Sequence, residues 1–352
     1  MSTINRSRAR ARARLLTTGA VAAASALVLA GCASGSPTPT ESAGGDDSGL
    51  SEIQQLAANA DPNAPEVDVI RGSLWQGPIS AQFILGGDVA EAEYGLAFEY
   101  DWMTDANVGR ARLAAGEIDI TPGSPYGAVN LTRSGSDALI VGGNYISQPG
   151  EQLVMALEGS GIEDVTDLAG KTIGMTAVTG VHPNRLRLAL ANAGLDPESL
   201  TVVATTYGEM AQQLKDGIID AASAAAFAIP PIREAGGVEI FDLGASPFDG
   251  RPENVWITTK SFYTAHPNAI AAFQCATAAG GALANDRPVM EGFMADVLGW
   301  NPGLISVSQS PHSVDGPLPL DKVQVDWDEE VELYGSEPFD VTSILIPFPK
   351  NC

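Results

Sequence analysis

Short apolar strands alternate with helices along most of the chain, and this alternation is the strongest constraint on its fold. The clearest example runs from residue 171 to residue 222, where three strand patterns are separated by two helical patterns. Gly194 and Gly217 directly follow these helices, and glycine is common where a helix ends. Strands connected through helices are usually parallel neighbours in one sheet. The sequence therefore predicts an α/β fold.

Two features predict that this fold is divided into two lobes. The chain has 352 residues, which exceeds the roughly 250–300 residues at which a single hydrophobic core stops growing. A helical pattern followed by a glycine and an Ile-Asp pair occurs at residues 116–119 and again at residues 217–220. This repetition indicates two lobes of similar construction.

The first 31 residues have the pattern of a secretory signal peptide. Five arginines between Arg6 and Arg14 precede an apolar run that extends from Leu15 to Ala30. This run is shorter than the ~20 residues that a membrane-spanning helix needs. It ends in Leu-Ala-Gly-Cys, which resembles the lipobox of bacterial lipoproteins, with Cys32 as the residue that receives the lipid. The alternative is a transmembrane anchor followed by an unmodified cysteine.

Residues 32–65 are expected to form a flexible tether, because positions 33–49 are almost all small, polar or acidic. Removal of residues 1–31 would take away five arginines and no acid, so the net charge would change from −24 to −29. A surface this acidic repels nucleic acid and anionic lipid headgroups. The composition therefore argues against nucleic acid as a partner.

Four motifs occur in an order that is typical of one protein family. They lie at residues 113–119 (LAAGEID), 167–174 (DLAGKTIG), 214–221 (LKDGIIDA) and 256–262 (WITTKSF). Their order and spacing resemble those of the solute-binding proteins of ABC importers. The nearest group is the nitrate, sulfonate, taurine and thiamine-precursor (NMT1/THI5-like, SsuA-like) binding proteins. The resemblance extends from about Val67 to Leu283.

This resemblance implies a type II periplasmic-binding-protein fold, with a ligand cleft between two lobes joined by two crossovers. Residues 66–155 and 251–352 would form lobe I, and residues 156–250 would form lobe II. It also implies an extracytoplasmic protein, anchored to the cell membrane by its lipidated cysteine, that delivers a small molecule to an ABC permease and ATPase. The alternative is a surface-tethered sensor or interaction module on the same fold, without transport.

Candidate ligand-binding residues follow the predicted strands, because ligands of open α/β sheets bind beyond the carboxyl ends of strands. They are Ser73, Trp75, Gln76, Ser124, Tyr126, Tyr145, Thr176, Thr179 and Phe227. Ser124 is equally well explained as a helix N-cap, and Trp75 as a cover for the edge of its lobe. Pro183 removes one N–H from a helix start, and the apolar Phe227 stands where related proteins have an acid. Both predict a neutral, zwitterionic or weakly charged ligand.

The sequence carries no motif of an enzyme. None of its three histidines lies beside a G-x-S-x-G turn, and it has no P-loop and no H-E-x-x-H. Three cysteines are too few for a zinc cluster. We therefore expect no catalytic residue, no cofactor and no metal. The acidic run at residues 326–330 is interpreted as a solvated face, with a calcium site as the less favoured alternative.

Two cysteines remain after lipidation, Cys275 in an Ala-rich helical stretch and Cys352 at the C-terminal end. Thiols of exported proteins meet oxidising conditions. We therefore expect a disulfide that holds the C-terminal tail against lobe I, with a buried free Cys275 and a loose tail as the alternative.

The Cys32→Ser variant tests the lipid anchor. Because serine lacks the thiol that forms the thioether, the variant is expected either to leave the membrane fraction or to remain unprocessed. The measurement is detergent-phase partitioning with immunoblotting. A variant of mature size that still enters the detergent phase would contradict the assignment.

Overall fold

The computed structural model describes residues 51–103, 106–308 and 312–352. The predictions for residues 1–31 and for Cys32 lie outside the described residues. All of the described residues belong to one compact unit, residues 49–352. Within them, helices are too short or too polar to cross a membrane.

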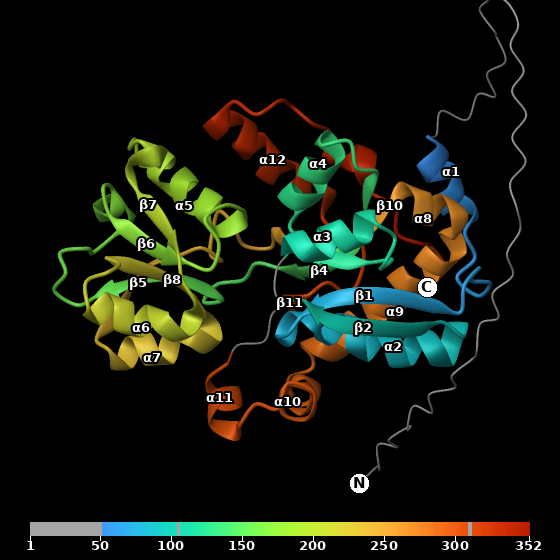
Figure 1. Ribbon diagram of the computed structural model, residues 1–352, viewed down its shortest axis with the longest axis horizontal. Coiled ribbons are helices and arrows are strands. Elements are labelled where there is room, and N and C mark those ends of the chain that lie inside the picture. The colour runs from blue at the N-terminus through green and yellow to red at the C-terminus, as the bar shows by residue number, and fades with distance from the viewer. Residues whose placement is uncertain (1–50, 104–105, 309–311) are drawn as a thin grey trace, which may run out of the picture. The chain divides into compact units, whose positions relative to one another are not determined.

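One sheet has five strands in the order β7-β6-β8-β5-β9 (Figure 1). Their bounds are β5 Gln152–Leu157, β6 Thr172–Met175, β7 Thr201–Ala204, β8 Ala221–Ala225 and β9 Gly237–Asp242. β6 is parallel to β7 and β8, as the strand–helix alternation predicted, whereas β5 is antiparallel to β8 and β9.

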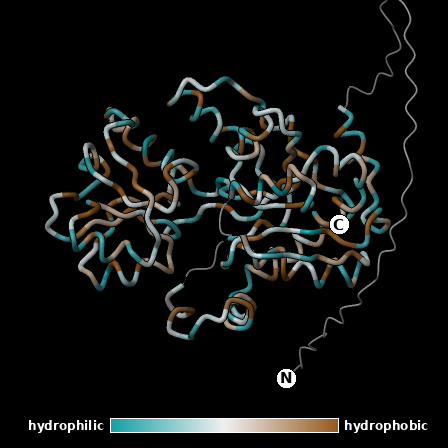
Figure 2. The backbone as a smooth tube through the Cα atoms, in the orientation of Figure 1, coloured by the Kyte–Doolittle hydropathy of each residue, from teal (hydrophilic) through white to brown (hydrophobic). Residues whose placement is uncertain are grey.

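Helices cover both faces of this sheet, and alternate residues of β5 face them. Val154 packs with residues of α5 (Val181–Asn192) on one side. Met155 packs with residues of α6 (Tyr207–Lys215) and α7 (Ile229–Glu234) on the other. Successive side chains of a strand point to opposite faces, so each face of β5 contributes to a separate core. Figure 2 shows hydrophobic backbone segments inside these layers.

The other strands form a four-stranded sheet in the order β11-β4-β10-β3 and a parallel pair, β1-β2. The bounds are β1 Val69–Trp75, β2 Ala97–Met103, β3 Thr121–Gly123, β4 Ala138–Ile146, β10 Pro252–Thr259 and β11 His312–Ser313. A bridge between Gly72 and Ile120 links β1 to the segment that enters β3.

Two helices, α2 (Ala81–Tyr94) and α9 (Pro267–Asn285), pack tightly against each other next to β1 and β2 (Figure 1). Glycine makes this approach possible, because a Cβ on Gly280 would lie 2.1 Å from the carbonyl oxygen of Gln82. The remaining helices are α1 Glu52–Asn59, α3 Ala106–Ala114, α4 Pro125–Arg133, α8 Lys260–Ala265, α10 Arg287–Asp296, α11 Pro302–Val307 and α12 Leu320–Tyr334.

The chain passes between the two groups of strands twice, after β4 and after β9. The two connections are hydrogen-bonded to each other, since Ser147 N donates to Arg251 O and Gly250 N donates to Ser147 O, both at 2.8 Å. We had expected lobe I to extend to residue 155. Strand pairing instead places residues 152–157 in the five-stranded sheet, because β5 pairs with β8 and β9.

The segment expected to be a tether is ordered in its last part. Helix α1 has a capping box in which Ser51 and Gln54 bond to each other's backbone. Its Ile53 and Leu56 pack against the hydrophobic core, and Glu66 accepts hydrogen bonds from two backbone N–H groups at the start of α9. Residues 51–65 therefore differ from the expected flexible tether, because they carry an apolar helical face that composition up to position 49 does not reveal.

Strand β1 is longer than the sequence indicated. Ser73 and Trp75 were expected to follow a strand, but the parallel register of β1 with β2 continues to Trp75. Gly72 permits close packing inside this strand, because a Cβ there would lie 3.0 Å from the ring of Phe83. Ser73 and Trp75 are thus strand residues.

A disulfide joins Cys275 in α9 to Cys352, the pairing that the sequence analysis expected. The tail is also held by backbone contacts, since Ile346 N donates to Ile140 O at 2.8 Å. The amide of Gln274 donates to the carbonyl of Pro347 at 3.3 Å. The C-terminal segment is therefore attached to β4 and α9.

Removal of this disulfide is expected to destabilise the protein. The bridge spans 77 residues, and closing a loop of that size restricts the unfolded chain by roughly 4 kcal/mol. Cys352→Ser is the cleaner variant because Cys352 is exposed, whereas Cys275 is buried. Chemical denaturation measures the loss, and the double variant should cost no more than the Cys275→Ser variant. Two alkylatable thiols in the unreduced protein would contradict the bridge.

Candidate functional site

A buried carboxylate, Glu253 at the start of β10, lies where the two groups of strands meet. Its side chain is 4% exposed. It contacts four side chains: Tyr145 Oη at 3.0 Å, Ser147 Oγ at 2.8 Å, His182 Nε2 at 2.9 Å and Arg185 Nη1 at 2.6 Å. Tyr145 comes from β4 and Ser147 from the first connection, while His182 and Arg185 come from α5. Glu253 thus joins both sides of the junction.

The start of α5 places two of these partners. His182 and Arg185 are three residues apart, so they share one face of the helix. The helix begins after Gly180, whose φ of 115° lies in the region that favours glycine. Pro183 occupies the first turn, where a missing N–H costs little. This local sequence directs a cation and an imidazole toward Glu253.

The charge of Glu253 is stabilised inside the protein. Burial alone would raise the pKa of the carboxyl, but His182 and Arg185 outweigh burial and hold the pKa well below its usual range. The Arg185 guanidinium also lies over the ring of Phe248, 5.2 Å from its centroid. Arg251 approaches the same ring at 5.1 Å. Phe248 therefore connects the Glu253 cluster to a second ionic group.

That second group corrects our interpretation of the acidic run at residues 326–330. Asp326 is buried and its carboxylate accepts a hydrogen bond from Arg251 at 2.9 Å. Glu329 also pairs with Arg251, and Trp327 is buried. Asp328, in contrast, is exposed. The run is thus a turn of α12 in which Asp326 and Trp327 are buried and Asp328 is exposed, and it is not a uniformly solvated surface.

Polar and aromatic side chains gather at the carboxyl ends of β6 and β8, next to Glu253. Gln152 Nε2 donates to Ser223 Oγ at 2.8 Å. Burial raises the pKa of the Tyr207 hydroxyl, and hydrogen bonds with Thr176 and Gln152 oppose that rise. The Tyr207 ring packs against Phe227 with centroids 5.0 Å apart, and Phe227 reaches Trp300 at 5.7 Å. We call these residues, with Tyr145 and Glu253, the junction cluster.

The structure brings three of the predicted ligand residues into the junction cluster, namely Tyr145, Thr176 and Phe227. Electrostatic interactions of Tyr145 with both Glu253 and Tyr207 show that the two sides meet there. Sequence reasoning missed Glu253, Arg185 and Tyr207. The spacing of His182 and Arg185 on one helix face was an available signal for two of the partners of Glu253.

The other predicted residues have different surroundings. Ser73 donates to Asp101 at 2.6 Å, and Ser124 caps α4 by accepting from Gly127 N. The hydroxyl of Tyr126 donates to the backbone carbonyl of Asp326 at 2.9 Å inside the core. Three further residues make no side-chain hydrogen bond to the junction cluster among the described residues: half-buried Trp75, exposed Gln76 and exposed Thr179.

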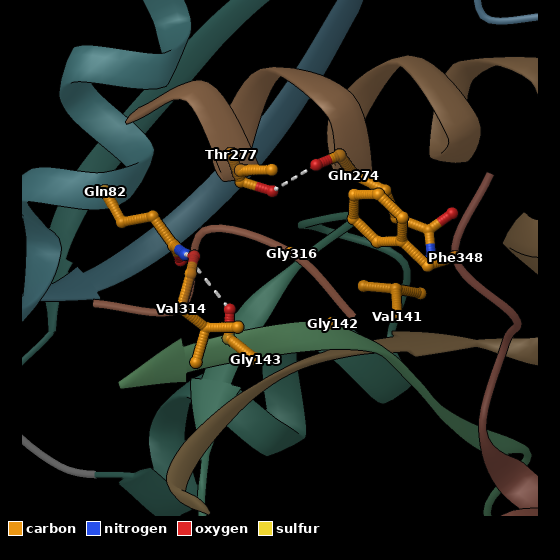
Figure 3. A pocket seen from close by; sticks show the side chains of 10 residues that line it. Gln82, Val141, Gly142, Gly143, Gln274, Thr277, Val314, Gly316 and Phe348 are labelled. Carbon is orange, nitrogen blue, oxygen red and sulfur yellow. Dashed lines mark hydrogen bonds between the residues drawn. The ribbon is translucent and has the colours of Figure 1, made fainter. Parts of the chain in front are cut away.

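A small cavity between α2, α9 and β4 is a poor candidate for a solute site. Figure 3 shows Gln82 reaching across it toward the carbonyl of Gly143, with Thr277 and Phe348 on its wall. Its volume is about 10 Å³, which is enough for one water molecule. This cavity is therefore too small to hold a solute. The junction cluster offers more polar and aromatic side chains that a solute could contact.

Comparisons with known proteins point to one family. The sequence profile described as NMT1/THI5 like matches residues 92–290, and no curated protein matches the chain. Among solved structures, the chain is similar to the periplasmic aliphatic sulphonate-binding protein SsuA of Escherichia coli. The two are 16% identical with a TM-score of 0.65, and the match covers 82% of this chain and 94% of that one.

Two further structures extend the comparison. The periplasmic nitrate-binding protein NrtA of Synechocystis PCC 6803 is 14% identical with a TM-score of 0.64, over 80% of this chain and 87% of its own. The desulfurization enzyme DSZB is 15% identical with a TM-score of 0.56, over 80% and 97%. At these identities the likeness shows the fold alone. It is the two-lobed α/β periplasmic-binding fold that the sequence predicted.

Glu253→Gln is expected to destabilise the protein by about 3–5 kcal/mol, because it leaves the buried Arg185 without a counter-ion. Glu291→Gln is the matched control, since its pair with Arg287 is exposed and contributes at most about 0.5 kcal/mol. Urea denaturation at pH 7 measures both. A loss as small as that of the control would contradict a structural role for Glu253.

The same carboxyl predicts a dependence on pH. Because the pKa of Glu253 is lower in the folded protein, its contribution is fully present above the unfolded value of about 4.3 and is lost as the pH falls below it. The difference in unfolding free energy between wild type and Glu253→Gln should therefore shrink below about pH 4. A difference that is constant from pH 7 to pH 3 would contradict this assignment.

Proposed function

The chain belongs to the NMT1/THI5-like family, and on this premise we propose that it captures a small molecule between two lobes and delivers it to an ABC importer. The observation that supports the proposal most is the junction cluster. It gathers hydroxyl, amide, carboxyl and aromatic groups at the carboxyl ends of β6 and β8, where ligands of such sheets bind.

Within this proposal, the five-stranded sheet and its helices are lobe II, and the remaining described strands belong to lobe I. We place the hinge at the two connections that follow β4 and β9, and lobe II at roughly residues 150–250. Closure of such lobes around a ligand is a common hinge movement. Tyr145 on lobe I and Tyr207 on lobe II would then face a bound solute from opposite sides.

The proposed ligand is neutral, zwitterionic or weakly charged, not a bare oxyanion. Arg185 and His182, the basic side chains at the junction, are already bonded to Glu253. Pro183 leaves one N–H fewer at the start of α5. Phe227 adds an apolar wall. Long-range repulsion by the acidic protein works in the same direction, although salt screens it over ~8 Å.

We propose an extracytoplasmic location, with the chain anchored to the cell membrane through Cys32. The disulfide between Cys275 and Cys352 supports this location, because disulfides persist in oxidising compartments. Binding is favoured over catalysis because Ser147 donates to Glu253 and not to a histidine, unlike the nucleophile of a hydrolase triad. A surface sensor on the same fold, without a transporter, is the alternative, and a neighbouring permease and ATPase gene would favour import.

A thermal-shift screen tests the proposed function. A ligand at ~100 times its Kd should stabilise the protein by ~2.7 kcal/mol, which is visible as a raised Tm. Phe227→Ala is expected to weaken binding, because it removes an aromatic face of the junction cluster. Trp102→Ala is the matched control, as Trp102 lies partly exposed on β2.

The screen should contain nitrate, sulfonates, bicarbonate and pyrimidines together with neutral and basic metabolites. A protein that no compound stabilises would contradict solute binding. Tight binding of nitrate or sulfate to the wild type would refute the proposed ligand class.

A further inference from the structure

We infer that Glu151 anchors the ligand and that the ligand therefore carries a cationic N–H group, such as an ammonium or an amidinium. This inference rests on the proposed function. It narrows the proposed ligand class, which was neutral, zwitterionic or weakly charged, to compounds with a positively charged nitrogen. It comes from the position of Glu151, from its unpartnered oxygen and from the charges around it.

Glu151 lies at the edge of the five-stranded sheet where the junction cluster gathers. It directly precedes β5, whose first residue, Gln152, pairs with Ala225 at the carboxyl end of β8. The backbone N–H of Ala226 donates to the carbonyl of Glu151 at 2.9 Å. Because β5 runs antiparallel to β8, its start coincides with the end of β8. Glu151 is thus placed next to Phe227.

The carboxyl of Glu151 is incompletely bonded. The backbone of Gln148 hydrogen-bonds to this carboxyl. Its Oε2 atom, in contrast, is buried and has no hydrogen-bond partner in the described part of the chain. Leaving a buried acceptor without a donor destabilises a protein, so native proteins usually supply one. A donor on the ligand would satisfy this atom.

The charges around Glu151 favour a cation as that donor. The carboxylates of Glu253 and Asp242 repel a negative charge on Glu151, whereas the guanidinium of Arg185 attracts it. Arg185, however, donates to Glu253 at 2.6 Å. Burial, followed by the charge of Glu253, raises the pKa of Glu151. A positively charged N–H group next to Oε2 would relieve both effects by pairing with the ionised carboxylate.

Arg185 is a weaker candidate for the anchoring residue, although two of its N–H groups, Nε and Nη2, are also buried without a partner. The carboxylate of Asp326 interacts favourably with Arg185 and has an unpartnered oxygen of its own. An anion bound at Arg185 would therefore face Asp326 as well as Glu253. The local charges thus disfavour an anionic ligand at this guanidinium.

The aromatic residues of the junction cluster suit an organic cation. The rings of Tyr207, Phe227 and Trp300 follow one another with centroid separations of 5.0 and 5.7 Å. Aromatic faces attract cationic groups and also stack with planar ones. A flat ligand with an amidinium or ammonium at one end would use these rings and Glu151 together.

Isothermal titration calorimetry on the whole protein tests the inference with three monosubstituted benzenes of different charge. Benzamidine is cationic, benzamide is its neutral counterpart, and benzenesulfonate is anionic. We expect wild type to bind benzamidine at least about tenfold more tightly than benzamide, since a hydrogen bond to a charged group contributes about 1.5–3 kcal/mol. We expect no detectable binding of benzenesulfonate.

Glu151→Gln should remove this preference, so that benzamidine and benzamide bind within about threefold of each other. Glutamine matches the neutral acid in shape, so the fold should be retained, and far-UV circular dichroism checks this. Glu151→Asp, which keeps the charge but withdraws the oxygen, should bind benzamidine more weakly than wild type. Glu158→Gln is the matched control, because Glu158 is exposed at the opposite end of β5 and should bind as wild type does.

Several results would overturn the inference. It fails if benzamidine does not bind, if benzamide or benzenesulfonate binds equally well, or if Glu151→Gln keeps the preference for benzamidine. If neutral or anionic compounds of the thermal-shift screen bind while benzamidine does not, only the inference fails and solute binding stands. If nothing in either experiment binds, the proposed function fails with it.

Discussion

The contact between Glu253 and Arg185 is the interaction on which the arrangement of the two groups of strands depends. It joins β10 to α5 at 2.6 Å, and neither side chain is more than 4% exposed. A buried ion pair of this kind adds little net stability compared with well-packed apolar residues, but loss of one partner is costly. The pair therefore specifies how α5 meets β10 more than it strengthens the fold.

A second link crosses the same junction through α12, which lies between α4 and α5 in Figure 1. On one side, Trp327 packs near Tyr126 with ring centroids 6.4 Å apart. On the other, Glu330 accepts a hydrogen bond from the amide of Asn184 in α5. The helix lies outside residues 92–290, the region that matches the family profile. A helix beyond the matched residues therefore also holds the junction together.

The sequence predicted the α/β class well because strand periodicity, helix spacing and terminal glycines are local signals. It predicted Tyr145, Thr176 and Phe227 as members of one site because each follows or ends a strand. The sequence did not predict the role of Glu253, because the function of an acid inside an apolar strand can be inferred only when its partners are known. Those partners lie more than 65 positions away on α5 and more than 100 away on β4. Ser73 and Trp75 were expected to follow a strand but lie within β1, because Gly72 does not end the strand and accommodates the ring of Phe83.

The two groups of strands also differ in whether their residues are continuous in the sequence. The five-stranded sheet uses one continuous stretch from Gln152 to Asp242, whereas the four-stranded sheet combines β3 and β4 with β10 and β11. A chain that emerges from its N-terminal end can thus complete the first sheet while the second still lacks two strands. Ile346 and Cys352 follow both sheets in the sequence, so their contacts with β4 and α9 need segments that are synthesised later. The disulfide can therefore form only after the whole five-stranded sheet has been synthesised.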